Sequence, residues 1–270
     1  MKLEKVLIRM PQVQELFFPA VAFVHDYMMQ LTGQMRAGLQ RPGTVTLELW
    51  REDQFFFTSL FPRLLLENGD KNRNLSRSEW ACVIDLRTPT RALELGATAG
   101  KHVTDAWGIM FGASPRVIAE LGFMSIWIPK EKEWDILVDA ELDEPVVLME
   151  WINQNFPDAK TDFVQLSRVR YSEMFDKLGS TRMYVGRRSA STYLAAMMKI
   201  PLVEYYPDDF PRTFLSKPAR PDYRVFFGDG RAINLWVGVQ ELWQTLSDTN
   251  YRDGTLTVRP VSTAELVAGK

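Results

Sequence analysis

The segment from residue 185 to residue 196 contains the residue types best suited to binding an anionic ligand. Its polar and conformationally special residues are Gly186, Arg187, Arg188, Ser189, Ser191 and Tyr193. A glycine permits a tight turn, and an arginine offers a fork of donors to phosphate oxygens. A serine can cap a helix whose first backbone N–H groups bind anions. We therefore expect these residues to hold a pyrophosphate group, with the alternative that Ser189 only caps its helix and the arginines are solvated.

The charge around this segment favours a local anion site. Between residues 182 and 224 there are six arginines and two lysines against four acidic residues, whereas the whole chain has a net charge of −2. The overall balance excludes a field that would draw the whole protein to nucleic acid or to an anionic membrane. A solvated charged face is the alternative explanation of the basic stretch.

A second group of candidates follows the first and third predicted strands. Arg9, Gln12 and Glu15 lie in or beside the loop after the first strand, and Asp85 and Arg87 end another apolar run. We expect Arg9, Gln12, Asp85 and Arg87 to bind the acceptor substrate. A carboxylate at a helix start is favoured by the helix dipole, which is one explanation of Glu15. The other is that Glu15, buried in a cleft, removes a proton from an acceptor hydroxyl as a general base.

Alternating strands and helices must position these residues. In the first half we predict strands at residues 5–10, 44–50 and 80–86, helices at 15–39, 55–66 and 105–111, and a turn at 67–72. In the second half we predict strands at 134–139, 162–166, 182–185 and 201–206 and helices at 145–156, 171–178, 189–199 and 235–246. This alternation is typical of parallel sheets covered on both faces.

The charged stretch from residue 125 to residue 133 separates two sections with this same rhythm. We therefore predict an α/β protein of two Rossmann-like domains, residues 1–125 and 126–270, whose parallel sheets face a central cleft. The length of 270 residues suits two modest domains.

The composition excludes several classes of protein. A single cysteine, Cys82, cannot form an intrachain disulfide, and with His25 and His102 as the only histidines no zinc cluster of Cys and His ligands can be assembled. No apolar run is long enough for a signal peptide core or a membrane helix. We expect a cytoplasmic location, no stable membrane insertion, no metal site and no cofactor.

Taken in order, four segments resemble the lipopolysaccharide heptosyltransferase family. They are residues 6–9 with Glu15, residues 81–87, residues 185–196 and residues 200–203. The resemblance implies a GT-B fold, with the first domain binding the acceptor and the second binding the nucleotide sugar. It implies metal-independent transfer of a sugar from a nucleotide-diphosphate donor to a glycan or other hydroxyl acceptor. Glu15 falls on the position of the family's catalytic aspartate, which implies the role of catalytic base.

The chain departs from the family in its later motif, which reads Asp-Ser-Gly-Pro, any residue, then His. Here Arg188, Ala190, Ser191 and Tyr193 replace the aspartate, glycine, proline and histidine, and Ser189 is kept. Two further interpretations therefore stay open. One is a catalytically degenerate binding or assembly protein with the same two-domain frame. The other is a transferase that acts on a nucleic-acid base through the basic stretch from Arg212 to Arg224.

Overall fold

The computed structural model describes part of the first half of the chain and most of the second. The described residues are 5–11, 16–21, 23–24, 27–28, 30, 44–49, 65–68, 80–87, 106–107, 110–111, 131–198, 200–207, 223–228 and 231–248. The predicted domain boundary at residues 125 and 126 lies outside them and stays a prediction. Glu15, Gln12, both histidines and residues 212–222 of the basic stretch also lie outside the described residues.

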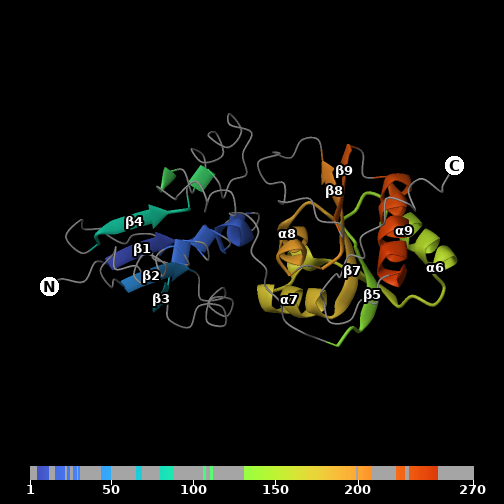
Figure 1. Ribbon diagram of the computed structural model, residues 1–270, viewed down its shortest axis with the longest axis horizontal. Coiled ribbons are helices and arrows are strands. Elements are labelled where there is room, and N and C mark those ends of the chain that lie inside the picture. The colour runs from blue at the N-terminus through green and yellow to red at the C-terminus, as the bar shows by residue number, and fades with distance from the viewer. Residues whose placement is uncertain are drawn as a thin grey trace, which may run out of the picture.

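The strands are β1 (Lys5–Arg9), β2 (Thr44–Leu49), β3 (Leu65–Asn68), β4 (Cys82–Asp85), β5 (Trp134–Asp139), β6 (Thr161–Val164), β7 (Thr181–Arg187), β8 (Leu202–Pro207) and β9 (Tyr223–Gly228). The helices are α6 (Pro145–Asn155), the 3₁₀-helix η2 (Leu166–Arg168), α7 (Tyr171–Gly179), α8 (Ala190–Met197) and α9 (Ala232–Asp248). Residues 16–21 are also helical. Figure 1 shows the two sheets in the two halves of the molecule.

The first sheet has the strand order β3-β2-β1-β4, and every pair of neighbours is parallel. Its central strand is β1, in which Leu7 and Ile8 are fully buried. Continuous apolar runs of this kind suit a sheet covered on both faces. The carboxyl ends of β1 and β4 point toward the second half of the molecule (Figure 1).

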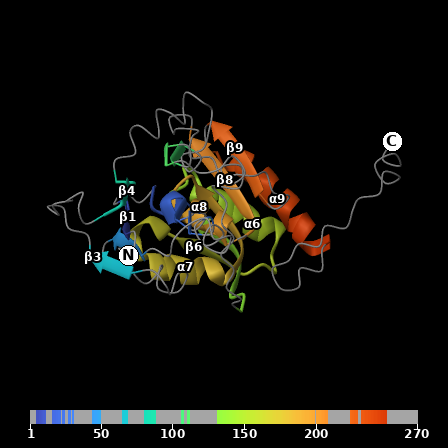
Figure 2. The same cartoon turned by 60° about the vertical axis from the view of Figure 1, so that its left-hand side comes forward.

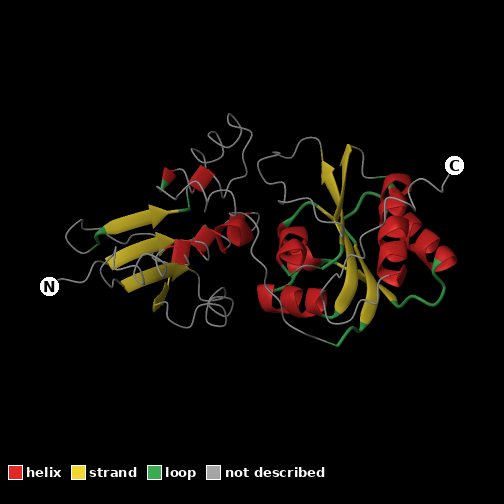
Figure 3. Cartoon of the chain, viewed as in Figure 1, coloured by secondary structure: helices red, strands yellow, loops and turns green. Residues whose placement is uncertain are grey.

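The second sheet has the order β6-β5-β7-β8-β9, and all of its neighbouring pairs are parallel. Figure 3 shows helices on both of its faces. α6 and α9 cover one face, where Leu148, Ile152 and Leu242 join a hydrophobic cluster with inward residues of β5 and β7. α7 and α8 cover the other face (Figure 1). Pro145 begins α6 because proline has no N–H to lose in the first turn.

Helix α8 lies in the interior of the molecule. All eight of its residues are buried, and its two small polar side chains, Ser191 and Thr192, form hydrogen bonds within the protein. Its hydrophobic cluster includes residues from both halves of the chain. The Phe17 ring stacks on the Tyr171 ring of α7 at a centroid distance of 4.5 Å. In Figures 1 and 2 the blue helix that contains Phe17 lies beside α8.

The structure confirms the α/β class and the two parallel sheets. The strand predicted at 134–139 coincides with β5, and the predicted helices at 145–156 and 171–178 match α6 and α7 to within one residue. Two predictions at residues 65–68 are wrong, because the end of a predicted helix and the start of a predicted turn form β3. Strand β9 was not predicted. The predicted central cleft stays a prediction.

Candidate functional site

Each sheet has one topological switch point, where two neighbouring strands are followed by connections that run to opposite sides of the sheet. In the first sheet this switch point lies between β1 and β4, and in the second it lies between β5 and β7. Loops that leave the carboxyl ends of two such strands diverge, and open α/β sheets bind ligands in the crevice between them. In the second sheet the divergence is visible in Figure 1, because α6 follows β5 on one face and α8 follows β7 on the other. These two edges are the candidate sites.

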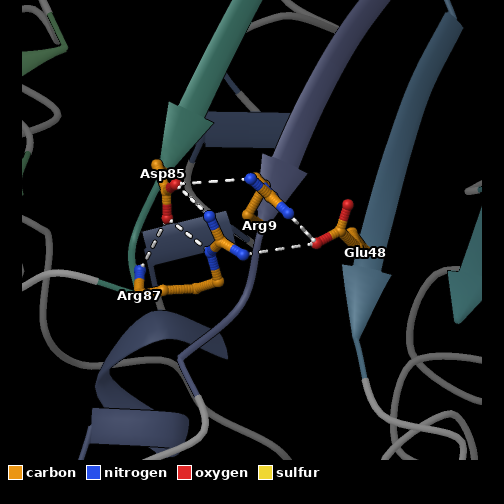
Figure 4. Close-up of polar contacts among 4 residues, drawn as sticks. All are labelled: Arg9, Glu48, Asp85 and Arg87. Carbon is orange, nitrogen blue, oxygen red and sulfur yellow. Dashed lines mark hydrogen bonds and ion pairs between the residues drawn. The ribbon is translucent and has the colours of Figure 1, made fainter. Parts of the chain in front are cut away.

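At the first switch point four charged side chains form a closed network (Figure 4). Arg9 donates from Nε to Glu48 Oε1 at 2.8 Å, and its Nη1 lies 3.8 Å from Asp85 Oδ2. Arg87 donates from Nε to Asp85 Oδ1 at 2.9 Å and from Nη2 to Asp85 Oδ2 at 2.7 Å, a bidentate geometry. Two guanidinium groups face two carboxylates, so the network is electrically neutral.

Burial divides this network into an inner and an outer part. Arg9 and Glu48 are 4% and 3% exposed, whereas Asp85 and Arg87 are only partly buried. Burial raises the pKa of Asp85, but the hydrogen bonds from Arg87 outweigh it and hold the pKa below its ordinary value. The hydrogen bond to Asp85 in turn raises the pKa of Arg87. Of the predicted acceptor-binding residues that the structure describes, Asp85 and Arg87 have exposed surface, whereas Arg9 is buried.

At the second switch point the first side chain is Asp139, the last residue of β5, which is 2% exposed. Its Oδ1 accepts the backbone N–H of Glu141 at 3.0 Å, and its Oδ2 accepts the Tyr184 hydroxyl at 3.0 Å. Burial raises the pKa of Asp139 to about 6, with the hydrogen bonds opposing this shift. A buried acid at a switch point whose pKa lies close to neutrality is a typical feature of functional sites.

Two serines extend this group to the beginning of α8. Tyr184 Oη and Ser191 Oγ are 2.9 Å apart, and Ser191 Oγ and Ser189 Oγ are 2.7 Å apart. Ser189 also forms a capping box with Thr192, whose hydroxyl accepts the Ser189 backbone N–H at 3.0 Å. Gly186 lies within β7, so the tight turn predicted for it is wrong; a Cβ on Gly186 would lie 2.9 Å from the Tyr184 ring, so glycine here leaves room for that ring.

The two adjacent arginines of the predicted pyrophosphate segment have different environments. Arg187, at the end of β7, is exposed, and no acidic oxygen within the described part of the chain lies close enough to form an ion pair with it. Arg188 is 5% exposed and pairs through Nη1 with Glu204 Oε1 at 3.0 Å. Its guanidinium carbon lies 5.0 Å from the centre of the Tyr193 ring. Arg188 and Tyr193 therefore pack against each other inside the protein.

The outer part of this edge carries a second carboxylate. Glu141 Oε1 accepts hydrogen bonds from Gln165 Nε2 at 3.0 Å and from the Ser167 hydroxyl. Burial raises the pKa of Glu141, but these two bonds together with the nearby Arg168 and Arg187 outweigh it and lower the pKa overall. Arg187 is close enough to lower the pKa of both Asp139 and Glu141. The edge thus combines two exposed arginines, Arg187 and Arg168, with two carboxylates and the start of a helix.

The structure brings Gly186, Arg187, Ser189 and Ser191 together at one edge, and Arg9, Asp85 and Arg87 together at the other. It adds four residues that the sequence analysis did not single out, namely Glu48, Asp139, Tyr184 and Glu204. Asp139 had a usable signal, since it ends an apolar strand just as Asp85 does. Within the described residues no group of three or more acidic, His or Cys side chains could hold a metal ion, and no helix could span a membrane.

Comparison with solved structures identifies the fold. A glycosyl transferase family 9 protein from Veillonella parvula DSM 2008 superposes with a TM-score of 0.55 at 10% identity, over 94% of this chain and 94% of that chain. E. coli heptosyltransferase WaaC with ADP gives 0.51 at 11% identity, over 88% and 99%. The iron-containing dodecameric glycosyltransferase TibC from enterotoxigenic E. coli H10407 gives 0.52 at 10% identity, over 83% and 63%.

These likenesses show the fold alone. The chain has the two-domain α/β architecture of GT-B glycosyltransferases, as the sequence resemblance predicted. It spans about 63% of the length of TibC. No protein-family model matches the sequence, and no curated protein matches it.

Proposed function

We propose that the protein is a glycosyltransferase that uses a nucleotide-diphosphate sugar, with the diphosphate at the edge between β5 and β7. One observation supports this site above the others. The N-terminus of α8 and the exposed Arg187 side chain lie together at the switch point of the second sheet. The backbone N–H groups of a helix start, and a guanidinium that pairs with no carboxylate among the described residues, are both complementary to a diphosphate.

The sequence-predicted residues receive different tasks in this proposal. Arg187 contacts the diphosphate, Ser189 lies at the helix start beside it, and Gly186 leaves room for the Tyr184 ring. Arg188, Ser191 and Tyr193 have partners within the protein, so we assign them support of the edge rather than contact with the donor. A pyrophosphate ligand for Arg188 would first have to compete with the buried ion pair to Glu204.

The chemistry in this proposal is sugar transfer without a metal. Glu15 removes the proton from the acceptor hydroxyl as the sugar leaves the diphosphate through an oxocarbenium-like transition state. Asp85 and Arg87 at the first edge supply hydrogen-bonding groups for a hydroxyl-rich acceptor. Closure of the two domains over the donor would keep water from hydrolysing it.

Donor binding is tested by calorimetric titration with ADP-glucose, UDP-glucose and GDP-glucose near pH 6. We expect at least one to bind, and Arg187→Ala to weaken binding by about tenfold or more, the usual effect of losing a charge-assisted hydrogen bond. Arg182→Ala is the matched control, because Arg182 is an exposed arginine near the opposite end of the same strand. No binding by the wild-type protein, or equal losses in the two variants, would contradict the proposed site.

Catalysis is tested separately by Glu15→Gln. We expect this variant to bind the donor with unchanged affinity and to lose transfer, measured as release of the nucleoside diphosphate in the presence of sugar acceptors.

A second candidate function is a binding protein without turnover. The packing of Arg188 on Tyr193 favours it, because two residues that replace family motif positions support the interior. Donor binding with no turnover in the wild-type protein would decide for this candidate.

A further inference from the structure

Three hydroxyl groups in a row connect the buried Asp139 carboxylate to the beginning of α8. The row runs from Asp139 Oδ2 to Tyr184 Oη at 3.0 Å and on to Ser191 Oγ at 2.9 Å. It ends at Ser189 Oγ, 2.7 Å further on. Asp139, Tyr184 and Ser191 are buried, whereas Ser189 is partly exposed. The row therefore has one buried end that can ionise and one end that a ligand can reach.

The charge of Asp139 determines the direction of every hydrogen bond in this row. An ionised carboxylate only accepts, so the Tyr184 hydroxyl must donate to it. Each hydroxyl has one proton, so Ser191 then donates to Tyr184, and Ser189 donates to Ser191. Ser189 consequently presents only lone pairs outward. Lone pairs repel the oxygens of a phosphate group.

Protonation of Asp139 reverses the direction of every hydrogen bond in the row. The proton belongs on Oδ2, because Oδ1 already accepts the Glu141 backbone N–H. Asp139 then donates to Tyr184, Tyr184 donates to Ser191, and Ser191 donates to Ser189. The proton of Ser189 is now free to point outward and to donate to a phosphate oxygen. Protonation thus changes Ser189 from an acceptor into a donor without moving a heavy atom.

We propose that Asp139 is a positioning residue that acts through Tyr184 and Ser191 to set whether Ser189 donates to a diphosphate at α8. Binding of the donor is then coupled to uptake of one proton from solvent, which adds to Asp139 Oδ2. This inference rests on the proposed function and specifies how the same site is regulated.

The surroundings of Asp139 allow it to take up this proton near neutral pH. Burial raises the pKa of Asp139 to about 6. The charged and titratable groups that face it are Glu141 in the following loop and Tyr184 and Arg187 on β7, while Arg168 of η2 acts on Glu141. Tyr184 stays protonated because burial raises its pKa well above the ordinary value. Glu141 titrates below its ordinary value and so remains ionised while Asp139 changes charge.

The test is a calorimetric titration with ADP-glucose at several values between about pH 5 and about pH 8. The pyrophosphate diester of this probe keeps the same charge over that range, so a change in affinity reports on the protein. We expect the wild-type affinity to fall by about tenfold or more as the pH rises through that interval, as coupling to one proton requires. Titrations in two buffers with different ionisation enthalpies should show proton uptake.

Two variants should each remove the pH dependence of binding, by different routes. In Asp139→Asn the side-chain amide donates toward Tyr184, as protonated Asp139 would, so we expect tight binding at all pH values. In Ser191→Ala the row is interrupted while the Tyr184 bond to Asp139 is kept, so we expect loss of the pH dependence and of proton uptake. Ser180→Ala is the matched control, since Ser180 is a buried serine that precedes β7 and donates to the Lys177 carbonyl.

The double variant separates relay from simple charge repulsion. If Asp139 acts through the row, Asp139→Asn adds no affinity when Ser191→Ala is already present. If the gain persists in the double variant, Asp139 acts through space and the proposal is overturned. Wild-type binding of ADP-glucose that does not depend on pH also overturns it and leaves the proposed function standing. No binding of ADP-glucose, UDP-glucose or GDP-glucose by the wild-type protein at any pH overturns both.

Discussion

The two sheets place ionisable residues at the same topological position but give them opposite partners. Between β1 and β4, Asp85 receives a bidentate arginine, and its pKa is lowered. Between β5 and β7, Asp139 is almost fully buried, and this burial raises its pKa to about 6 against the opposing effect of the hydrogen bonds from Tyr184 and the Glu141 backbone. Both carboxylates end a parallel strand, so the depth of burial and the charge of the partner, rather than the place in the fold, determine the direction of each pKa shift.

This difference indicates different roles for the edge between β1 and β4 and the edge between β5 and β7. An ion-paired edge keeps its charges over the physiological pH range and holds a fixed shape. An edge whose acid is bonded to hydroxyl groups can change protonation at little structural cost, because hydroxyls both donate and accept. We infer that the first edge provides a rigid surface for the acceptor and that the second responds to the charge of the donor.

The largest expected effect concerns the inner part of the ion-paired edge. Arg9→Met leaves Glu48 buried without its main cation, so we expect a loss of about 3–5 kcal/mol in the free energy of unfolding. Arg87→Met removes a partly exposed arginine from the same network and should cost below about 1 kcal/mol. Urea unfolding followed by tryptophan fluorescence measures both. Similar losses in the two variants would show that the network is not divided into a buried and an exposed part.

The second prediction uses the raised pKa of Asp139. A buried acid that ionises at about pH 6 instead of at the ordinary aspartate pKa of 3.8 favours folding at low pH. This stabilisation is complete below about pH 4 and is lost as the pH rises through about 6, by about 3 kcal/mol in total. Asp139→Asn should lack this dependence. The difference in unfolding free energy between variant and wild type should therefore move in favour of the variant from pH 4 to pH 7, and a constant difference would contradict the raised pKa.

The sequence predicted the fold well where the local pattern is unambiguous. Residues 134–139 form a long buried strand, and their apolar run between charged and acidic ends admits few other structures. Residues 65–68 follow another leucine, and such a short apolar run fits a helix as well as a strand. Strand β9 is an edge strand after a stretch rich in proline and charge, and only its pairing with β8 establishes it.

The candidate site was predictable as a segment but not residue by residue. Arg187 ends β7 and is exposed, whereas Arg188 follows the strand and is buried. Which of the two is buried depends on Glu204, 16 residues away from Arg188 on β8. The bond between Tyr184 and Asp139 spans 45 residues, and no local pattern encodes it. Long-range partners therefore decided the roles that the motif left open.

The third prediction concerns Gly186 of β7, which lies against the Tyr184 ring. Gly186→Ala places a Cβ 2.9 Å from the Tyr184 ring, so the ring must shift and the row of hydroxyls with it. We expect a loss of about 1–3 kcal/mol in stability together with weaker ADP-glucose binding. Gly238→Ala in α9 is the matched control, because its Cβ would lie 2.6 Å from the Phe226 ring. That variant should lose stability and keep its binding affinity, measured by calorimetry on the folded protein, and equal loss of binding would remove the link between Tyr184 and the site.

The smallest expected effect belongs to Asp85, and it should have the opposite sign to that of Asp139. Because the pKa of Asp85 is lowered, its stabilisation is present above its ordinary pKa and is lost as the pH falls below about 4. The pair with Arg87 is partly exposed, so the effect should stay below about 1 kcal/mol and shrink in high salt. Urea unfolding of Asp85→Asn should show its deficit relative to wild type narrowing toward pH 3. A deficit that narrows with rising pH, as expected for Asp139→Asn, would mean that the pKa values of Asp85 and Asp139 are shifted in the same direction.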